Sequence, residues 1–133
     1  MANLGLEIVT PDRKFYEDEV DMVVLKTIEG DMGVLYDHVP TVVPLSIGAI
    51  KLKQVGKIKQ DACAGGFVNI TEEKVTVITD AAEWPEEIDK IRADSAKKRA
   101  EERLNQKDDD IDFKRAKLAL AKAMNRLTIS EVN

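Results

Sequence analysis

The chain has 133 residues, 44% of them hydrophobic and 34% charged, a composition typical of a folded globular protein and unlike that of a disordered one. No apolar run is long enough to cross a bilayer, and the N-terminal residues show neither the basic nor the hydrophobic segment of an export signal. The single Cys63 cannot form an internal disulfide, so we expect a protein of a reducing compartment, the cytoplasm.

Residues 1–83 are predicted to form an all-β domain. Leu4, Leu6 and Ile8 alternate with polar or small residues, and the following Thr10-Pro11-Asp12 supplies a turn. Further strands, separated by glycine or polar turn signals, are predicted at residues 20–27, 48–54, 57–64, 66–70 and 74–79. Short strands with frequent turns predict an antiparallel sandwich or barrel. Because strands and helices do not alternate, a dinucleotide-binding fold is not expected.

Residues 84–133 are predicted to form an antiparallel hairpin of two helices, so that the fold class is α+β overall. Pro85 suits the first turn of a helix, and Glu86 and Glu87 suit the positive end of its dipole. The helical spacing recurs at Ala93, Ala96, Ala100 and Leu104, and again at Phe113, Ala116, Leu120, Ala123 and Leu127. Aspartates of the polar break at 106–110 are expected to cap the second helix. Such narrow, Ala-rich stripes bury little surface, so we expect a weakly held, mobile element.

The net charge of −5 is unevenly distributed between these two parts. Residues 1–83 contain 8 Lys and Arg against 14 Asp and Glu, a net charge of −6, whereas residues 84–133 contain 12 against 11, a net charge of +1. Residues 113–127 carry five cations and no acid. This basic helix indicates either an acidic partner or ligand, or simply a solvated helix face.

The sequence offers no sign of catalytic chemistry or of a metal site. One His and one Cys are too few for a metal cluster or a supported nucleophile. We expect His38 to be a hydrogen-bonded loop residue and Cys63 a small core residue. Gly65-Gly66-Phe67 is too short to form a phosphate-binding loop. We therefore expect a protein that is not an enzyme, with no catalytic residues and no metal.

Four stretches of sequence, in this order, carry a resemblance. They are Val9-Thr10-Pro11-Asp12, Gly33-Val34-Leu35 with His38 and Pro40, Gly65-Gly66-Phe67, and Asp109-Asp110-Ile111-Asp112-Phe113-Lys114-Arg115-Ala116. Together they resemble the epsilon subunit of a bacterial F-type ATP synthase over essentially the whole chain. One departure is Tyr36, where many relatives have Pro. The resemblance implies a sandwich of about ten strands followed by two helices.

The resemblance also implies a function. The sandwich would bind the gamma subunit and touch the c-ring, as part of the rotor that couples catalysis to proton or sodium transport. The helices would either fold together or extend along gamma into the alpha/beta catalytic head, where they would inhibit ATP hydrolysis. The basic second helix would then face acidic segments of the beta subunits. The protein would lie peripherally at the cytoplasmic side of the bacterial membrane, without inserting into it and without binding nucleic acid.

A ligand site is implied by Ile88-Asp89-Lys90-Ile91-Arg92-Ala93, which is similar to the motif with which some bacterial epsilon subunits bind ATP. The implied ATP-binding residues are Glu83, Ile88, Asp89, Arg92, Ala93, Arg99, Lys122 and Arg126. ATP, with or without Mg²⁺, would be a regulatory ligand that is not hydrolysed. Lys122 stands where the family usually has Arg, and Lys lacks the planar pair of donors that suits phosphate.

Counting residues shows whether these cations would meet in an antiparallel hairpin. Measured from Asp108, Arg92 lies 16 residues before and Arg126 lies 18 after, so the two are nearly level. Arg99 and Lys122 lie 9 before and 14 after, an axial mismatch of about 7–8 Å that long side chains span. The spacing therefore predicts that the four cations surround a polyphosphate only when the helices are paired.

Three alternatives remain open from the sequence. In the first, the chain is a purely structural coupling subunit whose helices never bind nucleotide, and Arg92 pairs locally with Asp89. In the second, it is a free-standing nucleotide-binding module. In the third, it is an ATPase, which is the least favoured alternative because a base, a metal cage and a phosphate loop are absent from the sequence.

Overall fold

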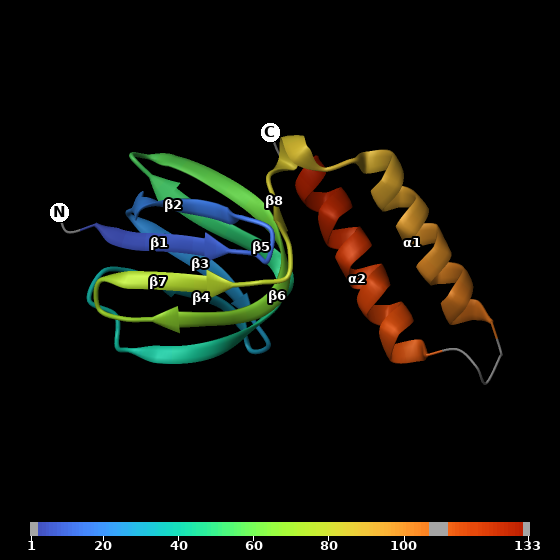
Figure 1. Cartoon of the computed structure of the whole chain (residues 1–133), viewed down its shortest axis with the longest axis horizontal. Coiled ribbons are helices and arrows are strands. Elements are labelled where there is room, and N and C mark those ends of the chain that lie inside the picture. The colour runs from blue at the N-terminus through green and yellow to red at the C-terminus, as the bar shows by residue number, and fades with distance from the viewer. Residues whose placement is uncertain (1–2, 107–111, 132–133) are drawn as a thin grey trace. The chain divides into compact units, whose positions relative to one another are not determined.

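The computed structural model describes residues 3–106 and 112–131. The chain divides into two compact units. The first unit is Met1–Glu83 and the second is Trp84–Asn133. Figure 1 shows strands in the first unit and helices in the second. No helix among the described residues is both long and apolar enough to span a bilayer.

The first unit is a β-sandwich, as predicted, with eight strands among the described residues. Its strands are β1 (Leu4–Val9), β2 (Lys14–Val20), β3 (Met22–Thr27), β4 (Gly30–Val34), β5 (Thr41–Gln54), β6 (Lys57–Ile70), β7 (Lys74–Ile78) and β8 (Ala82–Glu83). The sheet order is β2-β1-β7-β6-β5-β3-β4, and β8 pairs with β6 away from this path. All pairings are antiparallel except that of β1 with β7.

Two long strands give the sheet its folded-over shape. β5 and β6 have 14 residues each and pair from Thr41 with Ile70 to Gln54 with Lys57. One half of this hairpin carries β7 and β1, and the other half carries β3, so both layers share it. The sequence prediction was wrong here, since it broke β6 at residue 65, began β5 at residue 48 and expected about ten strands. It also missed β2 and β4.

Glycine explains why β6 continues through residue 65 instead of ending there. Gly65 and Gly66 have φ angles of +88° and +112°, which L side chains rarely adopt. A β-carbon at Gly66 would lie 2.1 Å from the carbonyl oxygen of Ile78. The strand therefore bends at these residues and approaches the end of β7 more closely than any side chain would allow.

The core is filled by inward-facing residues at alternating positions of strands β1 to β7. The largest fully buried side chains are Leu4, Leu6, Ile8, Leu25, Ile50, Leu52, Ile70, Val20, Val23, Val34, Val68 and Val75. At one end of the sandwich, Gln54 Nε2 donates to Asp18 Oδ2 at 3.0 Å and to the carbonyl oxygen of Glu19 at 2.9 Å, which joins β5 to β2. These bonds hold the two layers together where the sheet order leaves them unpaired.

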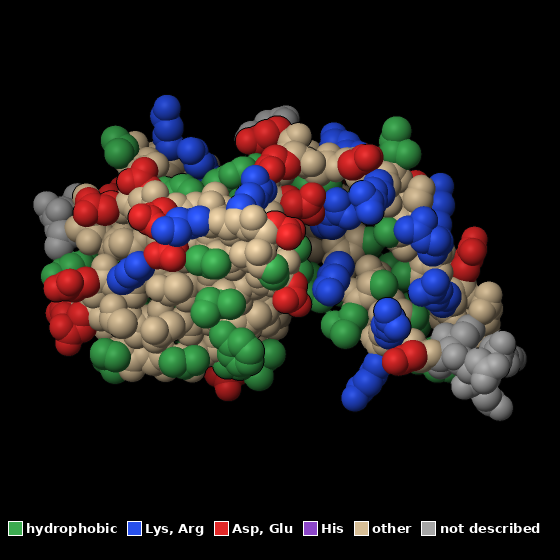
Figure 2. Space-filling model, viewed as in Figure 1, with side chains coloured by type: hydrophobic (Ala, Val, Ile, Leu, Met, Phe, Trp, Pro, Cys, Tyr) green, Lys and Arg blue, Asp and Glu red, His purple; other side chains and the backbone are tan. Residues whose placement is uncertain are grey.

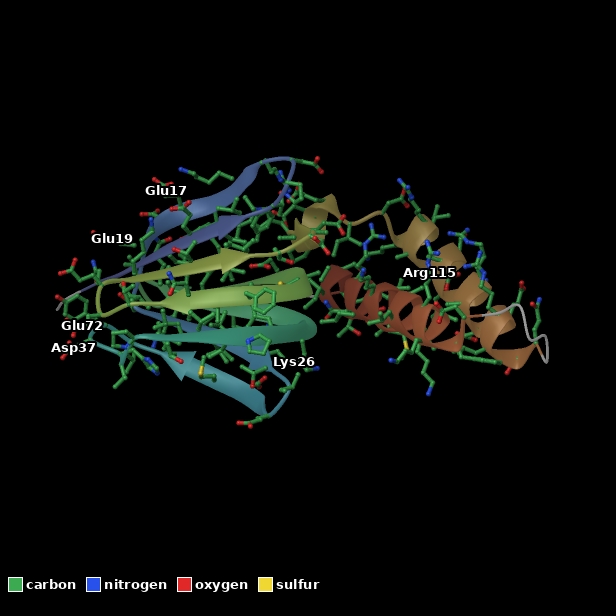
Figure 3. All side chains as sticks on the ribbon, turned by 60° about the horizontal axis from the view of Figure 1, so that its bottom comes forward. Glu17, Glu19, Lys26, Asp37, Glu72 and Arg115 are labelled. Carbon is green, nitrogen blue, oxygen red and sulfur yellow. The ribbon has the colours of Figure 1, made fainter. Side chains whose placement is uncertain are left out.

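The loop between β4 and β5 is anchored to the turn before β7. Asp37 has a φ angle of +69°, and its backbone N–H donates to the carbonyl oxygen of Glu72 at 2.7 Å. Figure 3 labels both residues at the same end of the sandwich. His38 Nδ1 lies 2.8 Å from the carbonyl oxygen of Val39, which confirms that this histidine is a hydrogen-bonded loop residue.

The second unit begins with a short 3₁₀ turn, η1 (Pro85–Glu87), followed by α1 (Lys90–Asn105) and α2 (Phe113–Ser130). Asp89 caps α1, and Asp112 caps α2, each accepting a hydrogen bond from the backbone N–H three residues later. The cap of α2 was expected from aspartates of residues 106–110. It is Asp112, while Asp108, Asp109 and Asp110 lie outside the described residues.

Candidate functional site

The two helices are joined along a seam of alanines. Ala93 and Ala100 on α1, and Ala116 and Ala123 on α2, are each at most 2% exposed. Both pairs are seven residues apart, so each helix presents small side chains on one face and the two backbones approach closely. This confirms the predicted helix faces, although Phe113 at the edge of the second face is 45% exposed. This close packing sets the distance between the side chains of α1 and those of α2.

Sequence analysis placed a nucleotide motif at the start of α1, and the structure shows what each residue does there. Asp89 Oδ1 accepts a hydrogen bond from the backbone N–H of Arg92 at 3.0 Å, so its carboxylate is the helix cap. Ile88 is buried, and its N–H donates to the carbonyl oxygen of Pro85. Ala93 is fully buried in the seam. The motif therefore has a structural role before any ligand is considered.

The four cations implied by the resemblance lie on both helices. Arg92, Arg99 and Lys122 are exposed, and Arg126 is half-buried. The last turns of α2 lie beside η1 and the start of α1 (Figure 1), and η1 contacts α2. Arg92 in the first turn of α1 and Arg126 near the end of α2 thus lie at the same end of the hairpin. Arg99 and Lys122 follow further along their helices.

Positive charge gathers on the helical unit. Figure 2 shows Lys and Arg side chains spread over both helices, whereas acids and hydrophobic side chains dominate the visible face of the sandwich. Two ion pairs on α1, Lys97–Glu101 and Lys98–Asp94, neutralise part of its charge. On α2, described residues 113–130 include no acid at all. An anion near these helices therefore meets a net positive surface.

Glu83, the remaining predicted ligand residue, belongs to the sandwich unit. It lies in β8, where it pairs with Ala62 of β6, and its side chain is half-buried. Trp84, the next residue and the only tryptophan of the chain, begins the helical unit. Its backbone N–H donates to Glu87 Oε1 at 3.0 Å, which fixes the start of η1.

The sandwich carries a second candidate surface, an exposed apolar row across three neighbouring strands. Pro44 of β5 pairs with Phe67 of β6, and Phe67 pairs with Ile78 of β7. Phe67 and Ile78 are 59% and 58% exposed, and Pro44 is exposed as well. Val42, two residues before Pro44 on the same face, extends this row. Apolar side chains placed in register on an exposed sheet face form a candidate binding surface.

Sequence analysis did not foresee the most unusual residue of the sandwich, Asp61. Its side chain is 0% exposed, and burial raises its pKa well above the ordinary value. Cys63, two residues later, is buried and lies 3.4 Å from Thr79 Oγ1, as expected for a small core residue. The signal that could have indicated burial of Asp61 is its position within the predicted strand at residues 57–64, close to the predicted core residue Cys63. Among the described residues, no group of three or more His, Cys, Asp and Glu is placed to hold a metal ion.

By its fold the chain belongs to the α+β proteins in which a β-sandwich precedes a two-helix unit, as predicted. Residues 3–85 match the family model of the beta-sandwich domain of the ATP synthase delta/epsilon chain. Residues 86–131 match that of its long alpha-helix domain. The chain therefore belongs to the ATP synthase delta/epsilon family, as an epsilon-type subunit of the central stalk of an F-type ATP synthase.

Relatives and solved structures agree with this family. The ATP synthase epsilon chain of Caldicellulosiruptor bescii is 46% identical over 133 residues, which cover 100% of this chain and 97% of that protein. The ATP synthase epsilon chain of Halalkalibacterium halodurans is 50% identical over 131 residues, 98% of each chain. A chain of the Euglena gracilis mitochondrial ATP synthase structure has a TM-score of 0.82 at 26% identity, covering 94% of this chain and 79% of that one.

Proposed function

We propose that this subunit couples rotation to ion translocation and also regulates ATP hydrolysis through its two helices, with ATP as the regulatory signal. The observation that carries this proposal is the cation arrangement of the helical unit. Arg92 and Arg126 lie at the same end of the paired helices, and Arg99 and Lys122 follow. Arg and Lys make strong charge-assisted hydrogen bonds to phosphate, and pairing of the helices would let cations from both helices bind one polyphosphate.

The regulatory mechanism follows from ligand linkage. A ligand that binds only the paired helices stabilises them by about 2.7 kcal/mol at a hundredfold excess over its Kd. That shifts the balance between paired and extended helices by roughly a hundredfold. When ATP falls, the helices separate, and basic α2 is freed to meet acidic segments of the catalytic beta subunits. Hydrolysis is then inhibited and the remaining ATP is conserved.

Calorimetric titration of the whole chain with ATP, with and without Mg²⁺, tests this proposal. We expect binding that Arg92→Ala and Arg126→Ala each weaken at least tenfold, the loss of one charge-assisted contact. Arg103→Ala is the matched control, because Arg103 is also exposed on α1 but lies in its last turn. Absence of heat, together with unchanged amide shifts at Arg92 and Arg126, would contradict nucleotide binding.

Hydrolysis assays of the reassembled enzyme decide between the proposal and its structural alternative. In a coupling subunit that never binds nucleotide, Arg92→Ala leaves the dependence of inhibition on ATP concentration unchanged. Under the proposal, Arg92→Ala makes hydrolysis more strongly inhibited at a given ATP concentration, because the extended helices are no longer disfavoured. Glu83→Gln and Lys122→Arg measure the contributions of the two remaining predicted ligand residues.

We also propose that the sandwich binds the gamma subunit through the exposed apolar row at Pro44, Phe67 and Ile78, with the c-ring and the alpha/beta head as further partners. The in-register exposure of these side chains supports this assignment. The complex would place the subunit at the cytoplasmic side of the bacterial membrane. Phe67→Ser should weaken co-purification with gamma by at least tenfold. Ile58→Ser, also at an exposed strand position, is the control.

A further inference from the structure

Asp61 is a carboxylic acid enclosed by the sandwich. It lies on the inner face of β6 directly opposite Ile50 of β5, and its side chain is 0% exposed. Neither carboxylate oxygen reaches solvent or has a hydrogen-bond partner among the described residues. A buried carboxylate without partners is strongly disfavoured, whereas the neutral acid is tolerated. This geometry, and not a nearby charge, accounts for the raised pKa of Asp61.

Few groups near Asp61 can compensate a charge. The β5 residues around Ile50, which are Gly48 and Leu52, carry none. Cys63 on the same face of β6 is a buried thiol whose pKa is raised by burial and also by Asp61. Lys59, two residues before Asp61, acts on Asp18 of β2 at the surface. Glu83 of β8 is opposite Ala62, so it belongs to the other face of β6.

Strand β8, which pairs with β6 next to Asp61, is held by few hydrogen bonds. β8 pairs with β6 only at Ala62 and Cys63, and the Ala64 N–H donates to the carbonyl oxygen of Ala81 at 3.0 Å. On its other side, β6 pairs with β5 along nearly its whole length. Separating β8 from β6 therefore breaks only these few pairings. It exposes the β6 edge beside Asp61 to water.

We propose that Asp61 is a proton-controlled switch for the pairing of β8 with β6. As a neutral acid it leaves the core dry and β8 paired. As pH rises above the ordinary range of an aspartate, ionisation is favoured only where water reaches the carboxylate, so the opened state gains population. β8 leads directly into the helical unit, so its release lengthens the tether of the helices. This inference does not depend on nucleotide binding.

The sign and size of the effect follow from linkage. The opened state ionises with an ordinary pKa and the closed state with a raised one. Between these two values the opened population grows by up to about tenfold per pH unit, and it levels off above the raised pKa. Protection of the Ala64 N–H against hydrogen exchange should fall by the same factor, after correction for the intrinsic exchange rate.

Two NMR measurements on the full chain test the switch across about pH 3 to about pH 9, a range that includes the ordinary pKa of an aspartate and raised values. The ¹³C shift of the Asp61 carboxyl should titrate well above that of exposed aspartates, and Ala64 protection should fall with pH. Asp61→Asn and Asp61→Val should both abolish the fall, and Val keeps the test valid if the buried amide prevents folding. Asp18→Asn, which changes an exposed acid, should leave it intact.

Three outcomes would overturn the proposal. The first is an Asp61 carboxyl that titrates at the ordinary value. The second is constant Ala64 protection across the pH series, and the third is an equal fall in the wild type and in Asp61→Val. Because none of these measurements involves ATP, their failure is distinguishable from failure of the nucleotide site.

Discussion

The backbone of Gly66 and the carbonyl oxygen of Ile78 are so close that a β-carbon on residue 66 would lie 2.1 Å from that oxygen. This contact fixes where the long strand β6 bends over the end of β7. It also explains why Phe67, the next residue, stands opposite Ile78 in the exposed apolar row. The glycine pair thus positions the exposed apolar row that we propose as the gamma-binding surface, a role quite different from that of a phosphate loop.

Gly66→Ala should therefore destabilise the sandwich by more than about 2 kcal/mol, because it adds both a clash and a strained φ angle. Urea unfolding followed by circular dichroism measures the loss. Gly33→Ala is the control, since nothing lies within 4 Å of a β-carbon there and no positive φ is involved. Equal stability of the two variants would show that β6 can bend without glycine at residue 66.

Val55 is a strained residue in the turn between β5 and β6. It forms the β5–β6 turn with Gly56, has a φ angle of +50° and is 86% exposed. Asn accepts this conformation much better than a β-branched residue, so Val55→Asn should stabilise the chain by about 1 kcal/mol. Thermal unfolding shows the gain. Val55→Thr keeps the β-branch and should give none, so a similar gain there would point to lost surface hydrophobicity instead.

Asp18 links the acid stability of the sandwich to Gln54. The hydrogen bond from Gln54 lowers the pKa of Asp18 below its ordinary 3.8. The carboxylate therefore stabilises the fold above that value, and its contribution is lost as pH falls through the lowered pKa. Gln54→Ala should raise the pKa of Asp18 toward 3.8, measured by ¹³C NMR. Gln60→Ala, a half-exposed glutamine on β6, should leave it where it is.

Asp89 has a role in α1 that is independent of any ligand. Asp89→Ala should cost about 1 kcal/mol of helix stability because the Arg92 N–H loses its capping partner. Asn caps helices as well as Asp, so Asp89→Asn should retain the helix content seen by circular dichroism. If Asp89→Asn nevertheless loses ATP binding, the carboxylate itself is needed by the ligand. If both variants lose helix equally, the capping assignment is wrong.

The alanine seam sets how closely the helices pack. Ala123→Leu should destabilise the paired helices by about 1–3 kcal/mol, because three extra carbons enter a filled interface. Ala121→Leu, on an exposed position of the same helix, should change little. Amide exchange of α1 and α2 reports the difference. Similar protection in the two variants would mean that the seam tolerates a wider separation.

The sequence predicted the fold class and the helix faces, because the spacing of Ala93 and Ala100, or Ala116 and Ala123, follows directly from the helical period. It failed on the strands for a physical reason. Glycine and proline normally interrupt strands, so the predicted strand ended before Gly65, and residues 41–47, which include Pro44, were not predicted as a strand. In the fold these residues lie inside β6 and β5, where tertiary pairing outweighs the local preference.

The site was predictable only in part. Residue counting placed Arg92 and Arg126 level with each other, and the antiparallel helices agree with that estimate. The sequence suggested only that Asp89 pairs locally with Arg92. In the structure, the backbone N–H of Arg92, and not its side chain, donates the capping hydrogen bond to Asp89. Asp61 could not be predicted to lie unpaired in the core, because alternation gives the face of a strand but not what covers it.

The hairpin of β5 and β6 makes one pair of strands common to both layers of the sandwich. Neither layer can then melt while the other survives, and the domain should unfold as a single cooperative unit. Under the coupling role that we propose, such a domain would transmit torque without deforming internally. Local flexibility is then expected at the short strand β8 and in the residues that follow it.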